Sequence, residues 1–220
     1  MLAEELISDQ IPSLKTSDTG ERALALMADY KLTELPIVNN TEFLGMITES
    51  DILDLHDVTA PIGNHKLSLE KPSVNAKEHI YEVLSKISNL NLMAIPILDD
   101  DRNYLGAISL PILIQAISNL AAIKDIGGIL QLEINEIDYS LSEISSIVES
   151  NGAKILSLYI RTHNDSPKMD VTLKISRTDL SPIIQTFERY NYTVAASFHK
   201  SDFQEELKQK YNQFLNYLNM

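Results

Sequence analysis

The sequence contains no cysteine. A chain without cysteine forms no disulfide, offers no thiolate nucleophile and builds no cysteine-based zinc or iron–sulfur site. This composition fits a reducing compartment, so we expect a cytoplasmic protein. The opening stretch, MLAEELISDQ, places acids where a secretory signal needs basic residues, and we therefore expect no export.

Positive charge is scarce. The chain has 18 Lys and Arg against 31 Asp and Glu, and most of the acidic excess falls in residues 1–125. Binding to DNA or RNA is driven by basic surface and counterion release, so we expect no nucleic-acid partner. The same acidic excess is compatible with binding of divalent cations, and a magnesium sensor is one alternative function.

Catalytic motifs are also missing. The sequence has no G-x-S-x-G, P-loop or dinucleotide fingerprint. Its histidines are scattered without metal-ligand spacing, at positions 56, 65, 79, 163 and 199. We therefore expect no catalytic residue, no metal ligand and no required cofactor, and we expect that the protein is not an enzyme.

One long stretch carries no charge. The segment from Tyr104 to Ile123 is long enough to span a bilayer, but Gly106, Pro111 and polar residues interrupt it. Its first half also matches an earlier part of the chain. We predict a buried strand followed by a buried helix, and no membrane insertion.

An internal repeat organises the front half of the chain. Residues 12–48 align with residues 72–109, with one residue inserted in an acidic turn. The identical pairs fall at core or turn positions: Pro12/Pro72, Leu24/Leu84, Leu32/Leu92, Pro36/Pro96, Ile37/Ile97, Leu44/Leu105, Gly45/Gly106 and Ile47/Ile108. The spacing of apolar residues predicts that each copy folds as strand, helix, strand, strand, helix.

The last two strands of each copy are expected to form a hairpin. They span residues 35–38 and 43–47 in the first copy, and 95–98 and 104–108 in the second. A polar turn joins the strands of each hairpin. In the first copy, Asp18 and Glu21 predict a capping box at the start of the preceding helix.

The hairpin runs into a helix through "GMITESDIL" at Gly45–Leu53 and "GAISLPILI" at Gly106–Ile114. The motif h-P-h-h, polar turn, h-h-G-h-h-S/T-x-x-D resembles a CBS domain. Two tandem copies resemble a CBS pair, or Bateman module, over about residues 8–120. The resemblance implies a sensing module that binds AMP, ADP, ATP, S-adenosylmethionine or another adenosyl ligand.

The resemblance also implies where the ligand would lie. The implied adenosine site comprises Met46, Thr48, Asp51, Pro72, Leu92 and Met93. The candidates for phosphate binding are Lys15, His65, Lys66 and Lys71. So few cations favour AMP, adenosine or a dinucleotide over free ATP.

Two roles are open for Asp51. It can form a capping box with Thr48 at the start of the helix, where the macrodipole favours an acid. It can also accept the two hydroxyl hydrogens of a ribose diol. The second copy has Ile112 at the matching position and Pro111 beside it. We therefore expect at most one adenosine site per chain.

The acidic turn at residues 99–101 is open in a similar way. Carboxylates suit magnesium, but aspartate is also common in solvated hairpin turns.

The back half follows a different pattern. After Gly127 and Gly128, apolar residues are spaced as in strand, helix, strand, strand, helix, strand, which is the ferredoxin-like order. The stretch "GGILQLEINEIDYSLSEISSIVESNGAKILSLYI" resembles the opening of an ACT domain. Many ACT domains bind amino acids at the first strand-to-helix loop, using a glycine. Here the loop at residues 137–141 has no glycine, so amino-acid binding stays open.

The expected fold class is α+β, with tandem CBS domains followed by a ferredoxin-like domain and a C-terminal helix. The expected boundaries are 1–62 and 63–125 for the CBS domains, 126–200 for the ACT-like domain and 201–220 for an amphipathic helix. The apolar side of that last helix and the apolar helix at residues 112–123 favour a homodimer.

The chain resembles CBS–ACT proteins of the acetoin-utilisation type. The resemblance implies a regulatory protein that binds an AMP-like ligand and signals through dimer or partner contacts. The alternatives are a structural or dimerisation module with a vestigial ligand site, and the magnesium sensor.

Overall fold

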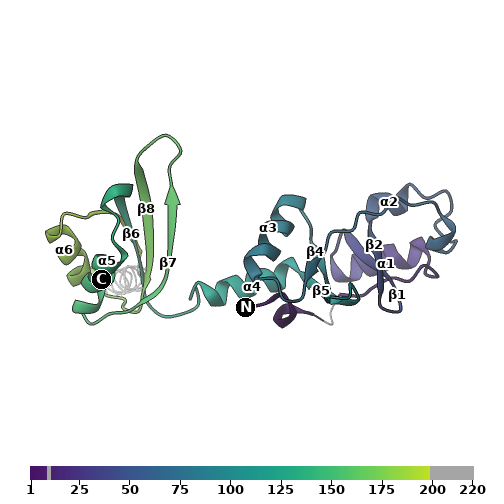
Figure 1. Cartoon of the computed structure of the whole chain (residues 1–220), viewed down its shortest axis with the longest axis horizontal. Helices are drawn as coiled ribbons and strands as arrows, with labels where there is room; N and C mark the ends of the chain where they lie inside the picture. Colours follow the sequence, from purple (N-terminus) through teal and green to yellow (C-terminus); the bar gives the residue numbers. More distant parts are fainter. Residues whose placement is uncertain (9–10, 199–220) are drawn as a thin grey trace, which may run out of the picture. The chain divides into compact units, whose positions relative to one another are not determined.

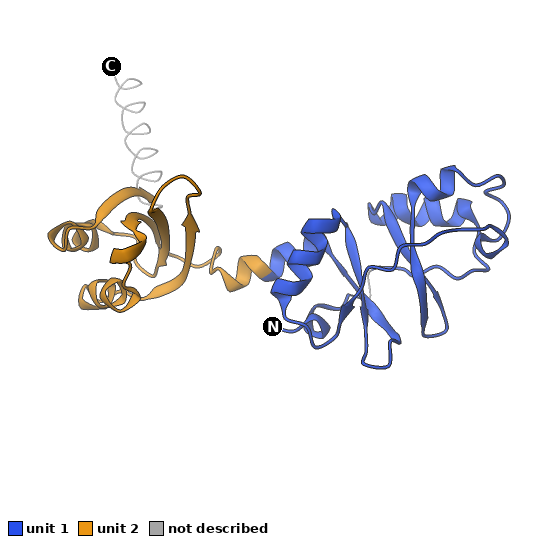
Figure 2. Ribbon diagram, turned by 45° about the horizontal axis from the view of Figure 1, so that its top comes forward, with its two compact units in different colours: residues 1–116 blue, residues 117–220 orange. Residues whose placement is uncertain are grey.

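The computed structural model describes residues 1–8 and 11–198. The chain divides into two compact units, Met1–Ala116 and Ile117–Met220, which we call unit 1 and unit 2 (Figure 2). Each unit has its own core and is considered separately. The helix expected at residues 201–220 lies outside the described residues.

Unit 1 contains the two predicted repeats (Figure 1). The first consists of α1 (Gly20–Tyr30), β1 (Glu34–Asn39), β2 (Glu42–Thr48) and α2 (Glu49–Leu53). The second consists of β3 (Val74–Asn75), α3 (Ile80–Leu90), β4 (Ala94–Leu98), β5 (Tyr104–Ser109) and α4 (Leu110–Leu120), and the boundary of unit 1 at Ala116 falls within α4. Leu14 takes the place of β3 in the first repeat, where it bridges Ile37 in parallel. The predicted element order is therefore confirmed in both copies.

The two hairpins share one register. In the first, Pro36 lies opposite Met46, and in the second Pro96 lies opposite Ala107. A bulge follows Ile37 in one copy and Ile97 in the other. Because side chains alternate between the faces of a strand, equivalent residues of the two repeats point to equivalent sides.

The start of α1 differs from the prediction. Its N-cap is Thr19, whose hydroxyl accepts a hydrogen bond from the Arg22 amide at 3.2 Å. Asp18 instead accepts from the Lys15 amide at 2.7 Å and so closes the turn before the helix. The expected capping box of Asp18 and Glu21 was wrong because the helix begins one residue later.

Each repeat receives an edge segment from elsewhere in unit 1. The Met46 amide of β2 donates to the Glu70 carbonyl at 2.8 Å, so the segment between the repeats pairs with the first hairpin. The N-terminal segment pairs with the second hairpin, because the Ser8 amide donates to the Ala107 carbonyl at 3.1 Å. A short 3-10 helix, η1 (Ala3–Leu6), precedes this contact. Residues at the start of the chain therefore complete the second repeat.

Unit 2 has the ferredoxin-like topology. Its elements are β6 (Gly128–Asn135), η3 (Glu136–Asp138), α5 (Leu141–Ser150), β7 (Ile155–Thr162), β8 (Lys168–Ile175), α6 (Ser181–Arg189) and β9 (Thr193–Phe198). The strands pair antiparallel in the order β7-β8-β6-β9. Helices α5 and α6 cover one face of this sheet (Figure 1), and Ile144, Val148 and Phe187 bury themselves against it. The predicted strand and helix order is confirmed.

The uncharged stretch from Tyr104 onward forms β5 and α4, so the predicted strand and helix are present. The predicted burial of the helix was wrong, because only Leu113 and Ala116 of α4 are buried, whereas Ile114 and Leu120 are exposed. Among the described residues, the structure contains no helix with the length and apolar character needed to cross a membrane.

Candidate ligand site between the repeats of unit 1

The junction of β2 and α2 is held by a reciprocal capping box. The Thr48 amide and hydroxyl donate to Oδ2 of Asp51 at 2.8 and 2.7 Å, and the Asp51 amide donates back to the Thr48 hydroxyl at 3.1 Å. Among the described residues, the carboxylate receives these bonds on Oδ2 alone, which leaves Oδ1 open. Asp51 therefore caps the helix, as one of its two predicted roles requires, and still has an oxygen to offer.

The matching junction of the second repeat forms without an acid. The Leu110 amide donates to the Met93 carbonyl at 2.8 Å, just as the Glu49 amide donates to the Thr33 carbonyl at 2.9 Å. Helix α4 has 11 residues, although Ile112 stands where the first repeat has Asp51, whereas α2 has 5. An acid at this position is therefore not needed to start the helix.

One face of the first hairpin points toward the second repeat. Glu34 lies directly opposite Thr48 on the paired strands, so their side chains are neighbours on one face. The Glu34 carboxylate crosses to the second repeat, where Oε1 accepts from the Met93 amide at 2.5 Å and from the Ala94 amide at 3.1 Å. These bonds bring Thr48 and Met93, two residues of the implied adenosine site from different repeats, close together.

Glu34 is a site residue that the sequence reasoning missed. It is 5 % exposed, and its Oε2 also accepts from the Thr33 hydroxyl at 2.5 Å. Three donors on two oxygens compensate for burying a carboxylate away from water. One signal was present in the sequence, because Glu34 aligns with Ala94 and so places an acid in an otherwise apolar strand.

The other implied adenosine contacts are placed as follows. Met46 is 4 % exposed and packs in a small cluster with Val38, Phe43 and Leu98, on the same face as Thr48. Leu92 and Met93 are half-buried just before β4, and Met93 packs against the core of the first repeat. Pro72 is half-buried and follows the segment that pairs with β2.

The four phosphate candidates do not form a cluster. Leu14 pairs beside β1 and Glu70 beside β2, so Lys15 and Lys71, which follow them, flank opposite edges of the first repeat's sheet. His65 and Lys66 follow the short helix η2 (Ile62–Asn64). Nε2 of His65 is buried and has no hydrogen-bond partner within residues 1–8 and 11–198.

Residues 3–57 match the family model of the CBS domain. The second repeat has the same elements in the same register. Residues 3–57 therefore form a CBS domain, and unit 1 has the architecture of a CBS domain pair.

Known proteins similar to this chain include one enzyme sequence and two solved structures. Inosine-5'-monophosphate dehydrogenase of Methanocaldococcus jannaschii is 30% identical over 111 residues, which are 49% of this chain and 22% of that enzyme. A CBS domain pair/ACT domain protein of Thermotoga maritima is 24% identical with a TM-score of 0.49, over 54% of this chain and 98% of that one. CBSX2 in complex with AMP is 17% identical with a TM-score of 0.46, over 54% of this chain and 96% of that one.

The acidic turn of the CBS pair is occupied by its own hydrogen bonds. Asp99 accepts from the backbone amide of Asn103 at 2.7 Å and from its side-chain amide at 3.0 Å, and these bonds hold its pKa below the usual value. Asp100 pairs with Lys77, which likewise lowers the pKa of Asp100. The described part of the chain contains no group of three or more acidic or histidine side chains arranged to hold a metal ion.

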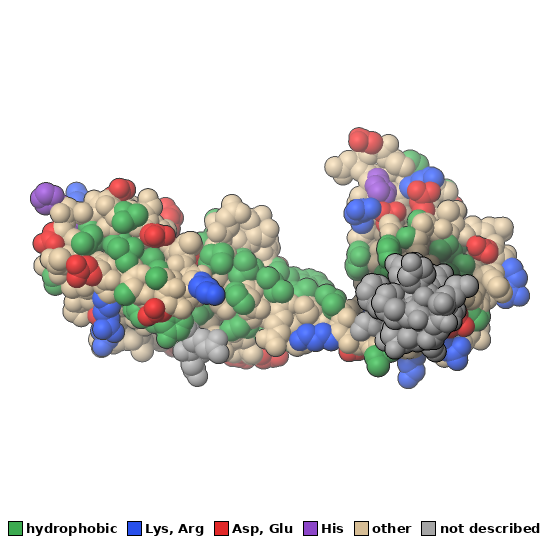
Figure 3. Space-filling view, turned by 180° about the vertical axis from the view of Figure 1, so that it is seen from behind, with side chains coloured by type: hydrophobic (Ala, Val, Ile, Leu, Met, Phe, Trp, Pro, Cys, Tyr) green, Lys and Arg blue, Asp and Glu red, His purple; other side chains and the backbone are tan. Residues whose placement is uncertain are grey.

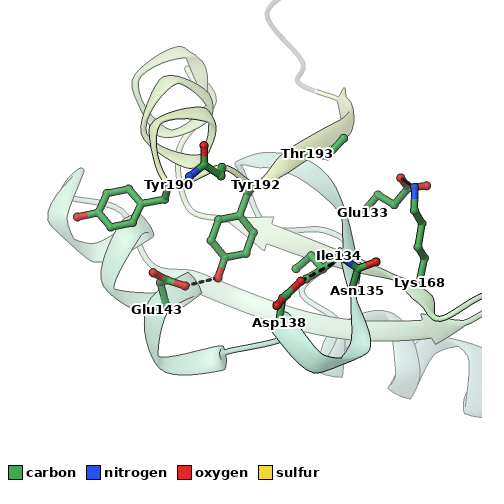
Figure 4. Close-up of a pocket in the computed structure, with 10 residues that line it drawn as sticks. Glu133, Ile134, Asn135, Asp138, Glu143, Lys168, Tyr190, Tyr192 and Thr193 are labelled. Carbon is green, nitrogen blue, oxygen red and sulfur yellow. Dashed lines mark hydrogen bonds and ion pairs between the residues drawn. The ribbon is translucent and has the colours of Figure 1, made fainter.

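Unit 2 contains a separate hollow at its first strand-to-helix loop (Figure 4). The hollow has a volume of about 460 Å³ and is lined by Glu133, Ile134, Asn135, Asp138, Glu143, Lys168, Tyr190, Asn191, Tyr192 and Thr193. Its polar groups largely pair with one another: Tyr192 donates to Glu143 at 2.6 Å, Asn135 to Asp138 at 3.0 Å and Lys168 to Glu133 at 2.5 Å. Burial and the Glu143 bond raise the pKa of Tyr192, so its hydroxyl stays protonated as a donor.

Proposed function

We propose that the CBS pair is a non-enzymatic sensor that binds an adenosine-containing, AMP-like ligand at Asp51 and passes binding on through dimer or partner contacts. One observation supports this most directly. Asp51 keeps a free carboxylate oxygen next to Thr48, whose strand partner Glu34 bonds to the other repeat, whereas the equivalent junction starts a longer helix with Ile112. The fold can omit an acid here, so a ligand role explains its presence better than capping alone.

The chemistry of the junction suits a nucleoside. A carboxylate can accept both hydroxyl hydrogens of a ribose diol, and charge-assisted bonds of this kind are stronger than neutral ones. Oδ2 of Asp51 already accepts two hydrogen bonds from Thr48, and Oδ1 has two lone pairs that can accept the diol. Leu92 and Met93 offer partly exposed apolar surface for the base on the facing repeat. Ile112 offers no such acceptor, which favours one site per chain.

Dimerisation is part of this proposal. Large apolar side chains remain exposed along α4 and just after it, at Ile114 (57 %), Leu120 (47 %) and Ile123 (62 %). Figure 3 shows hydrophobic side chains gathered over unit 1 and α4. Exposed apolar patches of this kind mark association surfaces. A homodimer gives the sensor a contact that ligand binding can alter.

A stability screen tests the sensor. We would measure the melting temperature with AMP, ADP, ATP, adenosine, S-adenosylmethionine and magnesium, in the wild type and in Asp51→Ala. A nucleotide or nucleoside that raises the wild-type melting temperature should lose that effect in the variant, because bound ligand stabilises the folded state by mass action. Equal shifts in both proteins would remove Asp51 from the ligand site.

A structural or dimerisation module is the second candidate function. The exposed apolar residues of α4 and the dispersed phosphate candidates favour it. In that case no compound in the screen would shift the melting temperature, while association between chains would persist. A shift with magnesium alone would instead favour the magnesium sensor.

Further assignments extend the proposal. We propose that unit 2 is an ACT-like domain, that the protein is of the acetoin-utilisation type, and that it acts in the cytoplasm. The ferredoxin-like topology of unit 2 supports the first of these.

A further inference from the structure

Glu34 places a buried carboxylate between the two repeats. Its side chain is neighbour to Thr48 on the paired strands, and Thr48 in turn is bonded to Asp51. The Met93 and Ala94 amides that hold Glu34 belong to the facing repeat, so the carboxylate lies between the walls of the proposed site. A ligand bound at Asp51 would therefore lie beside two carboxylates.

The protein places no matching positive charge there. Neutral amides and a hydroxyl satisfy Glu34. Among the described residues, no lysine, arginine or histidine pairs with Glu34 or Asp51. Charges that are buried or partly buried are screened weakly, so like charges a few ångströms apart repel by several times more than in water.

We infer that Glu34 sets ligand specificity by disfavouring phosphate, so that the site selects an adenosine moiety whose 5′ substituent is neutral or positively charged. This inference rests on the proposed function and narrows its ligand, because among adenosine-containing compounds it favours those without a phosphate over AMP itself. The diol and the 5′ carbon are attached to the same ribose ring. A 5′ phosphate therefore comes close to both carboxylates when Asp51 holds the diol. A 5′ ammonium in the same place is attracted by both.

The second repeat supports a specific role for Glu34. Ala94 occupies the matching strand position, and the β4–β5 hairpin keeps the same register without an acid. The fold therefore does not require a carboxylate at this position. Glu34 and Asp51 are both acids in the first repeat, and both are replaced by apolar residues, Ala94 and Ile112, in the second.

The test compares three ligands that share the nucleoside and differ in charge: 5′-amino-5′-deoxyadenosine, adenosine and AMP. Calorimetric titration would measure each dissociation constant for the full chain as wild type and as Glu34→Gln. Glutamine keeps an oxygen that can accept from the Met93 and Ala94 amides but removes the charge. Glu42→Gln is the matched control, because Glu42 is an exposed acid at the far end of the same hairpin.

We expect the wild type to bind the amine most tightly, adenosine next and AMP least tightly. Glu34→Gln should raise the affinity for AMP relative to that for adenosine on the order of tenfold, and Glu42→Gln should leave this ratio of affinities unchanged. AMP binding to the wild type as tightly as adenosine, or a ratio that Glu34→Gln does not change, would overturn the inference. The Asp51 proposal would survive either result if adenosine binding is still lost in Asp51→Ala.

A second measurement needs no variant and covers the case in which Glu34→Gln fails to fold. Raising the ionic strength screens charge. In the wild type it should therefore weaken binding of the amine and strengthen binding of AMP, each relative to adenosine. A ratio of AMP to adenosine affinity that is constant with salt would contradict the inference. Absence of binding by all three compounds would overturn the proposed function and the inference together.

Discussion

At the scale of single residues, Asp51 and Glu34 are satisfied in different ways. Asp51 bonds within its own turn, to a residue three positions away. Glu34 bonds across the repeats, to amides 59 and 60 positions away. A local motif in the sequence predicts the first arrangement. No local pattern reports the second, because its donors are backbone groups brought near only by the packing of the two repeats.

The capping role of Asp51 predicts a measurable contribution to the free energy of unfolding. Asp51→Ala removes the acceptor for the Thr48 amide and hydroxyl, and loss of a cap interaction costs about 1 kcal/mol. Asp51→Asn keeps an oxygen acceptor and should cost less. Denaturant unfolding measures both, with Asp54→Ala as control, since Asp54 is exposed at the other end of α2. An Asp51→Ala protein as stable as the control variant would contradict the capping role.

Tyr104 predicts how alkali affects unit 1. Burial raises the pKa of Tyr104 to about 12, from the usual tyrosine value of about 10. The protonated Tyr104 hydroxyl makes its full contribution to folding stability below pH 10, and this contribution is lost as the pH rises through about 12. The reason is that Tyr104 loses its proton at a lower pH in the unfolded chain than in the folded one. At pH 11 the difference is on the order of 1 kcal/mol.

The matched variant for this effect is Tyr104→Phe. It keeps the ring that stacks on Phe43 but removes the titrating group. The free energy of unfolding should therefore fall less between pH 8 and pH 11 in the variant than in the wild type. An identical fall in both proteins would show that Tyr104 ionises as easily when folded.

At the scale of elements, the sequence predicted the strands of each hairpin but not the distant segments that pair with them. The first hairpin, predicted at residues 35–38 and 43–47, forms as Glu34–Asn39 and Glu42–Thr48. Alternating apolar residues and a polar turn are local signals, which is why this prediction succeeds. The pairing of Ser8 with Ala107 and of Met46 with Glu70 has no comparable signal, because it depends on where distant segments settle.

The glycines of the two hairpins test these edge contacts. Gly45 has a φ of 147°, and an added Cβ would lie 2.5 Å from Leu69 Cβ and 2.9 Å from the Glu70 carbonyl oxygen. At Gly106, with a φ of 156°, an added Cβ would lie 2.5 Å from Cγ2 of Ile7, and its nearest neighbours among the described residues are atoms of that side chain and not backbone atoms. We expect Gly45→Ala to cost about 1–3 kcal/mol of unfolding free energy and Gly106→Ala less. Equal costs in denaturant unfolding would argue against the close approach at Gly45.

At the scale of the whole molecule, the chain combines two units with separate cores. The change from one hydrophobic pattern to another after Gly127 and Gly128 made two folds predictable from the sequence. The ferredoxin-like order of unit 2 followed from periodicity alone, because each of its strands alternates and each helix has one apolar side. The predicted helix at residues 201–220 lies outside the described residues.

Association between chains is a prediction at this scale. Sedimentation velocity at micromolar concentration should show a homodimer, because the exposed apolar residues of α4 gain from burial. Leu120→Glu should shift the distribution toward monomer, and Glu82→Gln, an exposed position on α3, should not. A wild type that sediments only as monomer would contradict the prediction.

The most direct test of the sensor proposal is calorimetric titration of adenosine into the wild type, Asp51→Asn and the control Asp54→Asn. We predict one adenosine per chain in the wild type and in Asp54→Asn. Asp51→Asn should bind at least about tenfold more weakly, since a hydrogen bond to a charged group contributes about 1.5–3 kcal/mol. Equal affinity in all three proteins, or two adenosines per chain, would contradict the assignment of a single ribose site at Asp51.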